Sequence, residues 1–444
     1  MTLAIVIVFL VGYLFISLES NLKVNKTAIA LLLSVVLWTM YTCGLQAYTP
    51  EGISLEAFKQ AVVNGNFVEH VGDTCEIIFF LLGAMTIVEV VDTNGGFNFV
   101  RQKLATRSKH TMLWRVVVVT FLLSATLDNL TTSIVMVMVL RKLVASKKTR
   151  MLYCGMVILA ANAGGAFSPI GDVTTIMLWI KGQVSASGVI SELLLPSLVT
   201  VIVPALVMHW QMKGKLRPMV KEPEATEEKY DFSLTQRNVV FYVGVVGLVS
   251  VPVFRAITGL PPFMGVILVL SILWIITEFF YSTRKIESNR AYRVSRVLHK
   301  IDMSTILFFL GILLSVAALE ETEVLSTFGK TLDSLTNGNH YLVTGVIGIA
   351  SSIVDNVPLV ASCMGMYGLQ AAGDFAQDGI FWQLLAYCAG TGGSILIIGS
   401  AAGVVVMGFE KISFGWYVRH FSLLALIGMI SGMAVYYLQR IIFF

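Results

Sequence analysis

Long apolar runs that do not alternate with polar residues dominate the chain. Windows of about 20 mostly apolar residues, enough to cross a bilayer as a helix, recur from one end to the other. Only helices and closed barrels satisfy their backbone groups in lipid, and continuous runs favour helices. The pattern predicts an all-α polytopic membrane protein. The first run, residues 2–18, is interpreted as a retained helix, because no basic residue precedes it and no small-x-small cleavage site follows it.

Composition supports this picture and excludes several functions. Only 13% of the residues are charged, against about 25% in soluble domains. The longest polar stretch, 213–237, is too short to bury a core, so no enzyme domain is expected. The net charge of +4 comes from basic residues in short loops, which indicates topology and not nucleic-acid binding. Five cysteines lie in apolar surroundings without a CxxC pair, so we expect neither a disulfide framework nor a cofactor.

Matched motifs at a near-constant offset predict an internal repeat. FFLLG at 79–83 matches LFFLG at 307–311, and LDN at 127–129 matches VDN at 354–356. Gly-Gly at 164–165 matches Gly-Gly at 392–393, and Gly171 matches Gly399. We therefore expect two copies of one unit, residues 1–212 and 238–444. The charged stretch 213–237 would join them as a cytoplasmic linker.

Loop charges predict that the two copies are inverted. Loops 101–110, 141–150 and 284–300 are basic and should be cytoplasmic, whereas loops 46–73, 320–340 and 373–379 are acidic or neutral and should lie outside. The apolar stretch 112–140 lies between basic loops and is too short for two crossings. It should form a re-entrant hairpin with Asp128 and Asn129 at its turn. Residues 341–370 should form the matching hairpin from the opposite side, with Asp355 and Asn356 at the turn.

A helix break is expected after each hairpin. NAGGAFSPIGD at 162–172 and GTGGSILIIGS at 390–400 are rich in glycine and polar residues, so residues 151–180 and 380–409 should be broken helices. Irregular backbone at that depth is tolerated only inside protein or along a wet cavity. The Gly pairs could also be close-packing contacts. Together these features predict about ten transmembrane helices, two re-entrant hairpins and two broken helices.

Oxygen-bearing side chains gather at these hairpins and breaks. Carboxylates within a membrane are costly and are usually functional. Carboxylate, amide and hydroxyl oxygens are the ligands of hard cations. Neither Arg nor Lys occurs in the broken regions, which argues against a di- or tricarboxylate substrate. The candidate ion- and proton-binding residues are Asp128, Asn129, Asn162, Asp172, Thr174, Thr175, Ser351, Asp355, Asn356, Thr391, Ser394 and, more weakly, Glu76.

Electrostatics suggests what these residues do. Burial and like-charged neighbours favour the protonated form of a carboxylate, so one site can hold either a proton or a sodium ion. Alternating access would turn that competition into exchange. We expect sodium at Asp128, Asp172 and Asp355, with Asn129, Asn162 and Asn356 completing the shell. In the simpler interpretation, each Asp only caps the helix that follows it.

At these positions the chain resembles the NhaD-type sodium/proton antiporters of the ion transporter superfamily. The resemblance rests on LDNLTTSIVM (127–136), NAGGAFSPIGDVTTIMLW (162–179) and SSIVDNVPLVA (351–361), and it covers essentially the whole length. It implies a dimerising scaffold domain, a moving transport domain, and export of sodium or lithium in exchange for protons across the bacterial inner membrane at alkaline pH. It also implies functional roles for Asp128, Asn129, Asn162, Asp172, Thr174, Thr175, Ser351 and Asn356. The dicarboxylate branch has Ser-Asn-Thr at the hairpin tips, where this chain has Asp-Asn.

Two alternatives remain open. A sodium-coupled carrier of a small anion could use the same fold, and anion-dependent uptake would identify it. An intramembrane aspartyl protease could use Asp128 with Asp172 or Asp355, but such a protease has no need of two inverted halves with matched glycine breaks.

Overall fold

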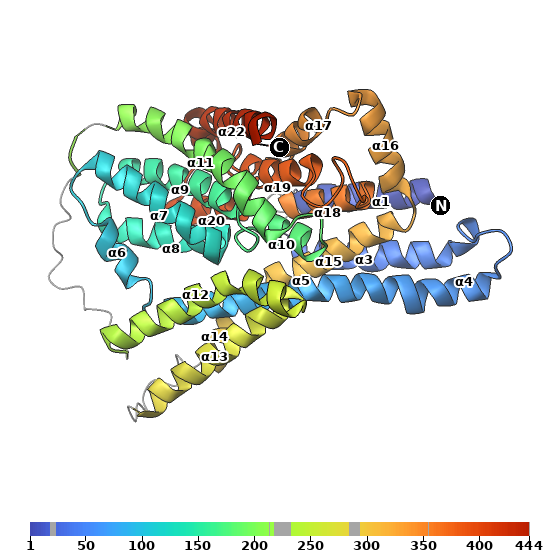
Figure 1. Cartoon of the computed structure of the whole chain (residues 1–444), viewed down its shortest axis with the longest axis horizontal. Coiled ribbons are helices and arrows are strands. Elements are labelled where there is room, and N and C mark those ends of the chain that lie inside the picture. Colours follow the sequence, from blue (N-terminus) through green and yellow to red (C-terminus); the bar gives the residue numbers. More distant parts are fainter. Residues whose placement is uncertain (18–23, 213, 217–231, 284–293, 354, 444) are drawn as a thin grey trace.

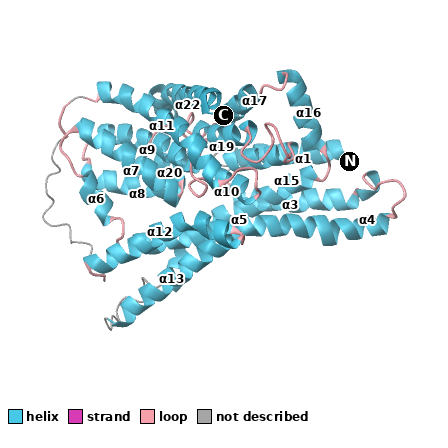
Figure 2. Ribbon diagram, in the orientation of Figure 1, coloured by secondary structure: helices cyan, strands magenta, loops and turns pink. Residues whose placement is uncertain are grey.

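The computed structural model describes residues 1–17, 24–212, 214–216, 232–283, 294–353 and 355–443. Every regular element in these ranges is a helix, and the only β-pairing within them consists of two isolated bridges (Figure 2). Most of the predicted linker and part of the basic loop 284–300 lie outside the described residues. The prediction of an all-α protein is confirmed.

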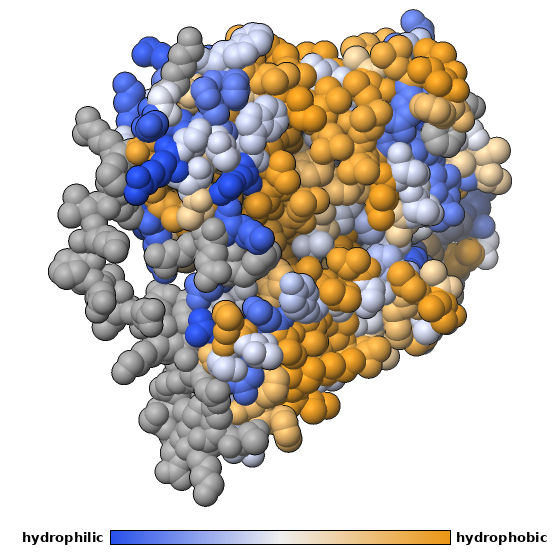
Figure 3. Space-filling model, turned by 60° about the vertical axis from the view of Figure 1, so that its left-hand side comes forward, coloured by the Kyte–Doolittle hydropathy of each residue, from blue (hydrophilic) through white to orange (hydrophobic). Residues whose placement is uncertain are grey.

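Eight helical segments of the described chain are long and apolar enough to cross a membrane. They are Lys26–Cys43, Leu55–Thr93, Lys109–Leu127, Ala186–Gln211, Leu234–Thr258, Pro262–Ser282, Met303–Glu320 and Phe414–Phe443. The second segment replaces much of the loop expected at 46–73, because α4 (Leu55–Ala61) runs through a π-helical turn at Val62–Asn66 into α5 (Phe67–Thr93). Large apolar side chains along α12 (Leu234–Thr258), α13 (Pro262–Thr283) and α22 (Leu423–Phe443) are exposed, and Figure 3 shows a broad apolar surface between polar ends. These features are those of a multi-pass membrane protein.

The two halves of the chain contain corresponding elements in the same order. The first half contains α1 (Thr2–Ser17), α3 (Lys26–Cys43), α5, α6 (Asn98–Leu104), α7 (Lys109–Leu127), α8 (Asn129–Leu143), α9 (Lys147–Ala166), α10 (Val173–Ile180) and α11 (Ala186–Gln211). The second contains α12 (Leu234–Thr258), α13 (Pro262–Thr283), α14 (Val294–Val297), α15 (Met303–Glu320), α16 (Val324–Thr336), α17 (His340–Ala350), α18 (Asn356–Met366), α19 (Ile380–Gly392), α20 (Ala401–Glu410), α21 (Phe414–Tyr417) and α22 (Leu423–Phe443).

Both hairpins have their expected aspartates at the turn. α7 and α8 meet at Asp128, and α17 and α18 are joined by a short segment that ends at Asp355. Figure 1 shows the two hairpins approaching from opposite ends of the bundle, as inverted repeats require. The first hairpin is longer than predicted: its helices extend to Lys109 and Leu143, beyond the expected limits of 112–140.

The helices pack in two groups. The frame helices are α1, α3, α5, α12, α13 and α15, and the site helices are α7–α11, α17–α20 and α22. Two of the pairings within the frame join the halves: α3 packs on α15, and α13 packs on α5. In each of them a helix of one half packs on a helix of the other. Among the site helices, α7 packs on α9 as α17 packs on α19, and α11 packs on α22. In Figure 1 the frame helices α5, α12 and α13 are drawn below the site helices, whereas α1 is drawn at the level of α18.

Matched glycines hold each hairpin against its broken helix. A Cβ on Gly164 would collide with the Phe121 carbonyl oxygen of α7, and one on Gly392 would collide with the Gly348 carbonyl oxygen of α17. These glycines allow two helix backbones to touch. A hydroxyl bond beside each contact repeats as well: Ser124 donates to the Ala161 carbonyl at 2.5 Å, and Ser351 donates to the Ala389 carbonyl at 2.7 Å.

The helix breaks are shorter than predicted. α9 continues to Ala166, so Asn162 and the Gly164–Gly165 pair are helical, and only 167–172 is irregular. α19 likewise continues through Gly392, which leaves 393–400. The expectation that the Gly pairs unwind the helices is therefore wrong for three of the four residues, since only Gly393 lies in a break. Their main role is close packing, because the hairpin backbone covers the groups that a break would expose.

Candidate ion-binding site

Asp128 stands at the first hairpin tip in a strained backbone conformation. Its φ of 79° and ψ of 157° fall in a region that is essentially restricted to glycine. It caps α8: Oδ1 accepts from the Thr131 amide at 2.7 Å, and Oδ2 accepts from the Thr131 hydroxyl at 2.8 Å. The half-buried carboxylate is thus held by neutral donors, and its strained backbone is typical of functional sites.

Asp172 is the most deeply buried of the three candidate aspartates, with 1% of its surface exposed. It ends the break in the first broken helix and caps α10, with Oδ1 accepting from the Thr174 amide at 3.0 Å and from its hydroxyl at 2.8 Å. Oδ2 accepts from Nδ2 of Asn129 at 2.8 Å. Across the described residues no lysine or arginine forms an ion pair with it, so this buried carboxylate is stabilised by neutral donors.

Asn162 connects the two halves of the chain at the centre of the site helices. Its Oδ1 accepts from Asn129 at 3.1 Å. Its Nδ2 donates to the hydroxyls of Ser394 and Ser400, each at 2.9 Å. A continuous buried network therefore runs from Asp172 through both asparagines to the second broken helix. Since each amide carries both a donor and an acceptor, this network can bind a carboxylate or a cation.

The second hairpin tip has a different environment. Asp355 caps α18 through a 3.4 Å bond from the Val357 amide to Oδ1, but its Oδ2 lies 3.2 Å from Nζ of Lys26 in α3. Its side chain is 30% exposed. The predicted absence of Arg and Lys holds for the broken segments themselves, but α3 supplies a lysine to this tip. The Asn356 side chain is buried, and within the described part of the chain it forms no hydrogen bond.

The remaining predicted residues occupy varied positions. Thr391 and Ser351 donate to helix carbonyls, of Tyr387 and Ala389 respectively. The hydroxyl of Thr175 is buried in α10 and has no hydrogen-bond partner among the residues that the structure describes. Glu76, in α5, interacts electrostatically with Arg255 of α12. No group of three or more His, Cys, Asp and Glu side chains suited to a metal ion occurs in the ranges described.

Sequence reasoning missed two contributors, Ser400 and Lys26. Ser400 is the repeat counterpart of Asp172, because each follows the matched glycine of its half, and their backbone angles agree closely. The offset of 228 residues could have identified it. No comparable signal marks Lys26, which is 329 residues from Asp355. All three aspartates cap the helix that follows them. Asp172 and Asp355 also have a carboxylate oxygen engaged beyond the cap, by Asn129 and Lys26 respectively.

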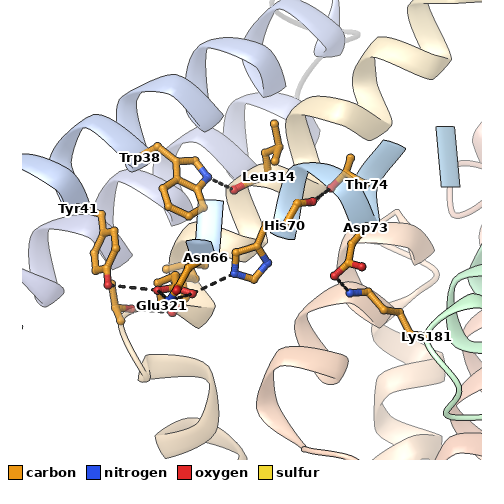
Figure 4. A network of polar contacts seen from close by, with 11 residues as sticks. Trp38, Tyr41, Asn66, His70, Asp73, Thr74, Lys181, Leu314 and Glu321 are labelled. Carbon is orange, nitrogen blue, oxygen red and sulfur yellow. Dashed lines mark hydrogen bonds and ion pairs between the residues drawn. The ribbon is translucent and has the colours of Figure 1, made fainter. Parts of the chain in front are cut away.

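A second polar network lies within the frame, where the ends of α3 and α15 meet the start of α5 (Figure 4). The Glu321 carboxylate accepts from Asn66 at 2.8 Å and from Tyr41 at 3.3 Å, and lies 3.0 Å from Nε2 of His70. Burial alone would raise the pKa of Glu321, but the hydrogen bonds and the His70 charge outweigh it and lower that pKa below its ordinary value. Nearby, Lys181 pairs with Asp73. This network joins α3, α5 and the end of α15, and stabilises the frame.

Residues 13–383 match the family model described as citrate transporter, CitMHS. The match covers most of the chain and includes both hairpins. The chain belongs to this citrate-transporter family. The family is one of transporters, and its model extends from the first frame helix into the second broken helix.

Within the citrate-transporter family, several relatives are named as antiporters. Sodium/proton antiporter 1 of Arabidopsis thaliana is 45% identical over 434 residues, which cover 98% of this chain and 72% of that protein. Sodium/proton antiporter 2 of the same plant is 40% identical, covering 97% of this chain and 98% of that protein. The Na(+)/H(+) antiporter NhaD of Vibrio cholerae is 30% identical, covering 91% and 84%. The resemblance to NhaD-type proteins is confirmed.

A solved structure shares the fold of this family member. The YdaH transporter of Alcanivorax borkumensis superposes with a TM-score of 0.59 over 94% of this chain and 98% of that one. The sequences are only 11% identical, so the likeness extends to the fold and not to the ligands.

Proposed function

We propose that this chain exchanges sodium or lithium ions for protons across a membrane by alternating access. The observation that carries the proposal is Asp172, a buried carboxylate at a helix break that is held only by neutral donors. A carboxylate with no built-in cation needs a proton or a metal ion to balance its charge in a dry environment. The antiporter names of the relatives agree with this reaction.

The ligands of the proposed site are oxygens. Asp172 supplies the charge, and Asn129 and Asn162 can rotate their amides to present oxygen to an entering cation. The buried Thr175 hydroxyl forms no hydrogen bond within the described residues, so it could bind a cation without breaking one. Proton and alkali ion would compete for Asp172, and Asp128 at the neighbouring tip would add a second negative charge that interacts with it. This competition is the coupling step of the exchange.

Several further features belong to the same proposal. The site helices would move against the frame helices, carrying the ion from one side to the other. The repeats would divide at the cytoplasmic linker 213–237, and the chain would lie in the inner (plasma) membrane of a bacterium as a homodimer that contributes to pH homeostasis. It would have no enzymatic activity.

A transport assay with a matched control tests the function. In everted vesicles with a pH-sensitive dye, sodium or lithium pulses should drive proton movement through the wild-type chain. Asp172→Asn should reduce that movement to background, and Asp128→Asn and Asp355→Asn should also reduce it. Asp302→Asn is the control: Asp302 caps α15 through the Ser304 and Thr305 amides in the same manner, but it is exposed and outside the site. Full exchange by Asp172→Asn would refute the assignment.

The family description favours one other function, a sodium-coupled carrier of a small anion such as a carboxylate. Such a carrier needs cationic or amide donors for its substrate. Citrate-dependent sodium uptake into proteoliposomes, without sodium-driven proton movement, would establish the carrier and exclude the exchanger.

A further inference from the structure

The ion pair between Lys26 and Asp355 joins a frame helix to the tip of a hairpin that belongs to the site helices. Lys26 is the first residue of α3, and Asp355 caps α18. The ammonium lies 3.2 Å from Oδ2, with 35% and 30% of the two side chains exposed. The protein thus leaves part of both side chains uncovered, and a second cation has room to approach the carboxylate.

The ammonium also lies over an aromatic ring. Nζ of Lys26 is 4.3 Å from the centroid of Phe308, a buried residue of α15. A cation is attracted to a ring face at this distance. The lysine has a long flexible stem, so its charge can leave the carboxylate and remain stabilised by the ring. The ring contacts the ammonium in the position that it occupies beside Asp355, and it would still stabilise the charge if another cation took the carboxylate.

Among the described residues, the pairing of a frame lysine with a hairpin-tip aspartate occurs at the second tip and not at the first. Trp38 of α3 corresponds to Trp274 of α13, an offset of 236, and by that offset Lys26 corresponds to Pro262. Asp128, the counterpart of Asp355, is held by the Thr131 amide and hydroxyl. The repeat accounts for an aspartate at both hairpin tips. It does not account for Lys26, because the corresponding position in the second half is a proline.

We propose that Lys26 is a gating and specificity residue whose ammonium occupies Asp355 in place of a transported cation. Two unit charges cannot share one carboxylate without strong mutual repulsion. An alkali ion must therefore displace the ammonium before it binds Asp355. The second hairpin can move along α3 only after the pair separates. The inference rests on the proposed exchange and adds to it a competitor supplied by the chain itself.

The kinetic test replaces the lysine and follows the sodium dependence of exchange at fixed pH. Lys26→Gln should lower the half-saturating sodium concentration on the order of two- to fivefold, the range that an exposed ion pair can supply. Lys26→Arg keeps the charge and should stay near the wild-type value. The control is Lys300→Gln: Lys300 pairs with Glu89 at 3.4 Å and similar exposure, but both residues lie outside the site helices.

A double variant separates competition from structural damage. In an Asp355→Asn background, Lys26→Gln should cause no further change in the half-saturating sodium concentration, because the carboxylate for which the ions compete is absent. The proposal is overturned if Lys26→Gln changes only the maximal rate, if it raises the half-saturating concentration, or if its effect persists in the Asp355→Asn background.

A binding measurement distinguishes failure of this inference from failure of the proposed function. A bound cation raises the melting temperature of the folded protein, so purified protein is melted in increasing sodium chloride with choline chloride holding the ionic strength. Lys26→Gln should reach half of the sodium effect at a lower concentration than wild type. Normal exchange with unchanged Lys26→Gln curves refutes the lysine role alone. A Lys26-dependent sodium effect without exchange refutes the exchange and supports the competition at Asp355.

Discussion

The two hairpins have the same sequence pattern, but the aspartates at their tips lie in different electrostatic environments. At the first tip, Asp128 is held by Thr131, and the adjacent Asn129 is bonded to Asp172 and Asn162. At the second, Asp355 pairs with Lys26 of the frame, and Asn356 is buried without a hydrogen bond in the described structure. At the first tip the Asn129 side chain bonds to residues of the site helices, whereas at the second tip the Asp355 side chain pairs with a frame helix. Equivalent positions in a repeat therefore do not imply equivalent roles.

The backbone packing of the two hairpins is nearly the same. Gly164 and Gly392 make matched contacts, and Ser124 and Ser351 donate matched hydrogen bonds. The difference between the halves therefore arises from a few polar side chains placed on a shared scaffold. The two hairpins therefore pack alike, and they differ in the polar contacts made at their tips.

The largest expected effect is the difference between the asparagines at the two tips, Asn129 and Asn356. Asn129→Ala removes two hydrogen bonds and leaves the buried Asp172 short of a donor, so we expect exchange to fall about ten- to hundredfold, which corresponds to the loss of a hydrogen bond to a charged group. Asn356→Ala should change exchange less than about threefold, since no such bond is lost. Sodium-driven proton movement in vesicles, corrected for the amount of inserted protein, measures both. Equal losses would show that the two tips act alike.

The matched glycines should respond alike. Gly164→Ala and Gly392→Ala each push a methyl group into a backbone carbonyl that cannot rotate away, and we expect each to destabilise the protein by about 1–3 kcal/mol. Gly408→Ala is the control, because Gly408 lies within α20 and a Cβ there meets nothing within 4 Å. The apparent melting temperature in detergent reports the difference. If only one of the two substitutions lowers the melting temperature, the two glycines do not make equivalent packing contacts.

The smallest expected effect concerns the strained aspartate. Asp128→Gly should relieve backbone strain worth about 1–3 kcal/mol while costing only a few tenths as a cap, so the melting temperature should rise although exchange is lost. Asp355→Gly should instead lower the melting temperature, because Asp355 has an ordinary φ of −53° and glycine adds only backbone freedom. If both variants melt at a lower temperature than wild type, the backbone conformation of Asp128 does not reduce the stability of the folded protein.

Much of the architecture was predictable because its signals are local or periodic. Apolar runs, loop charges and the 228-residue offset predicted helices, two opposed hairpins and two breaks, and all of these elements occur. The exact limits of the breaks were not predictable from composition. Gly164 and Gly392 favour unwinding in isolation, but an adjacent helix covers their backbone and keeps it helical.

By itself the sequence determined the membrane fold, the repeat and the set of oxygen-bearing residues, because lipid demands continuous apolar helices and leaves few places for polar groups. Only the tertiary structure decided which of those groups meet. It joined Asp172 to Ser400 through Asn129 and Asn162, and it brought Lys26 to an aspartate 329 residues away. Such contacts depend on how helices pack against one another, and helix packing is set by the whole bundle and not by any one segment.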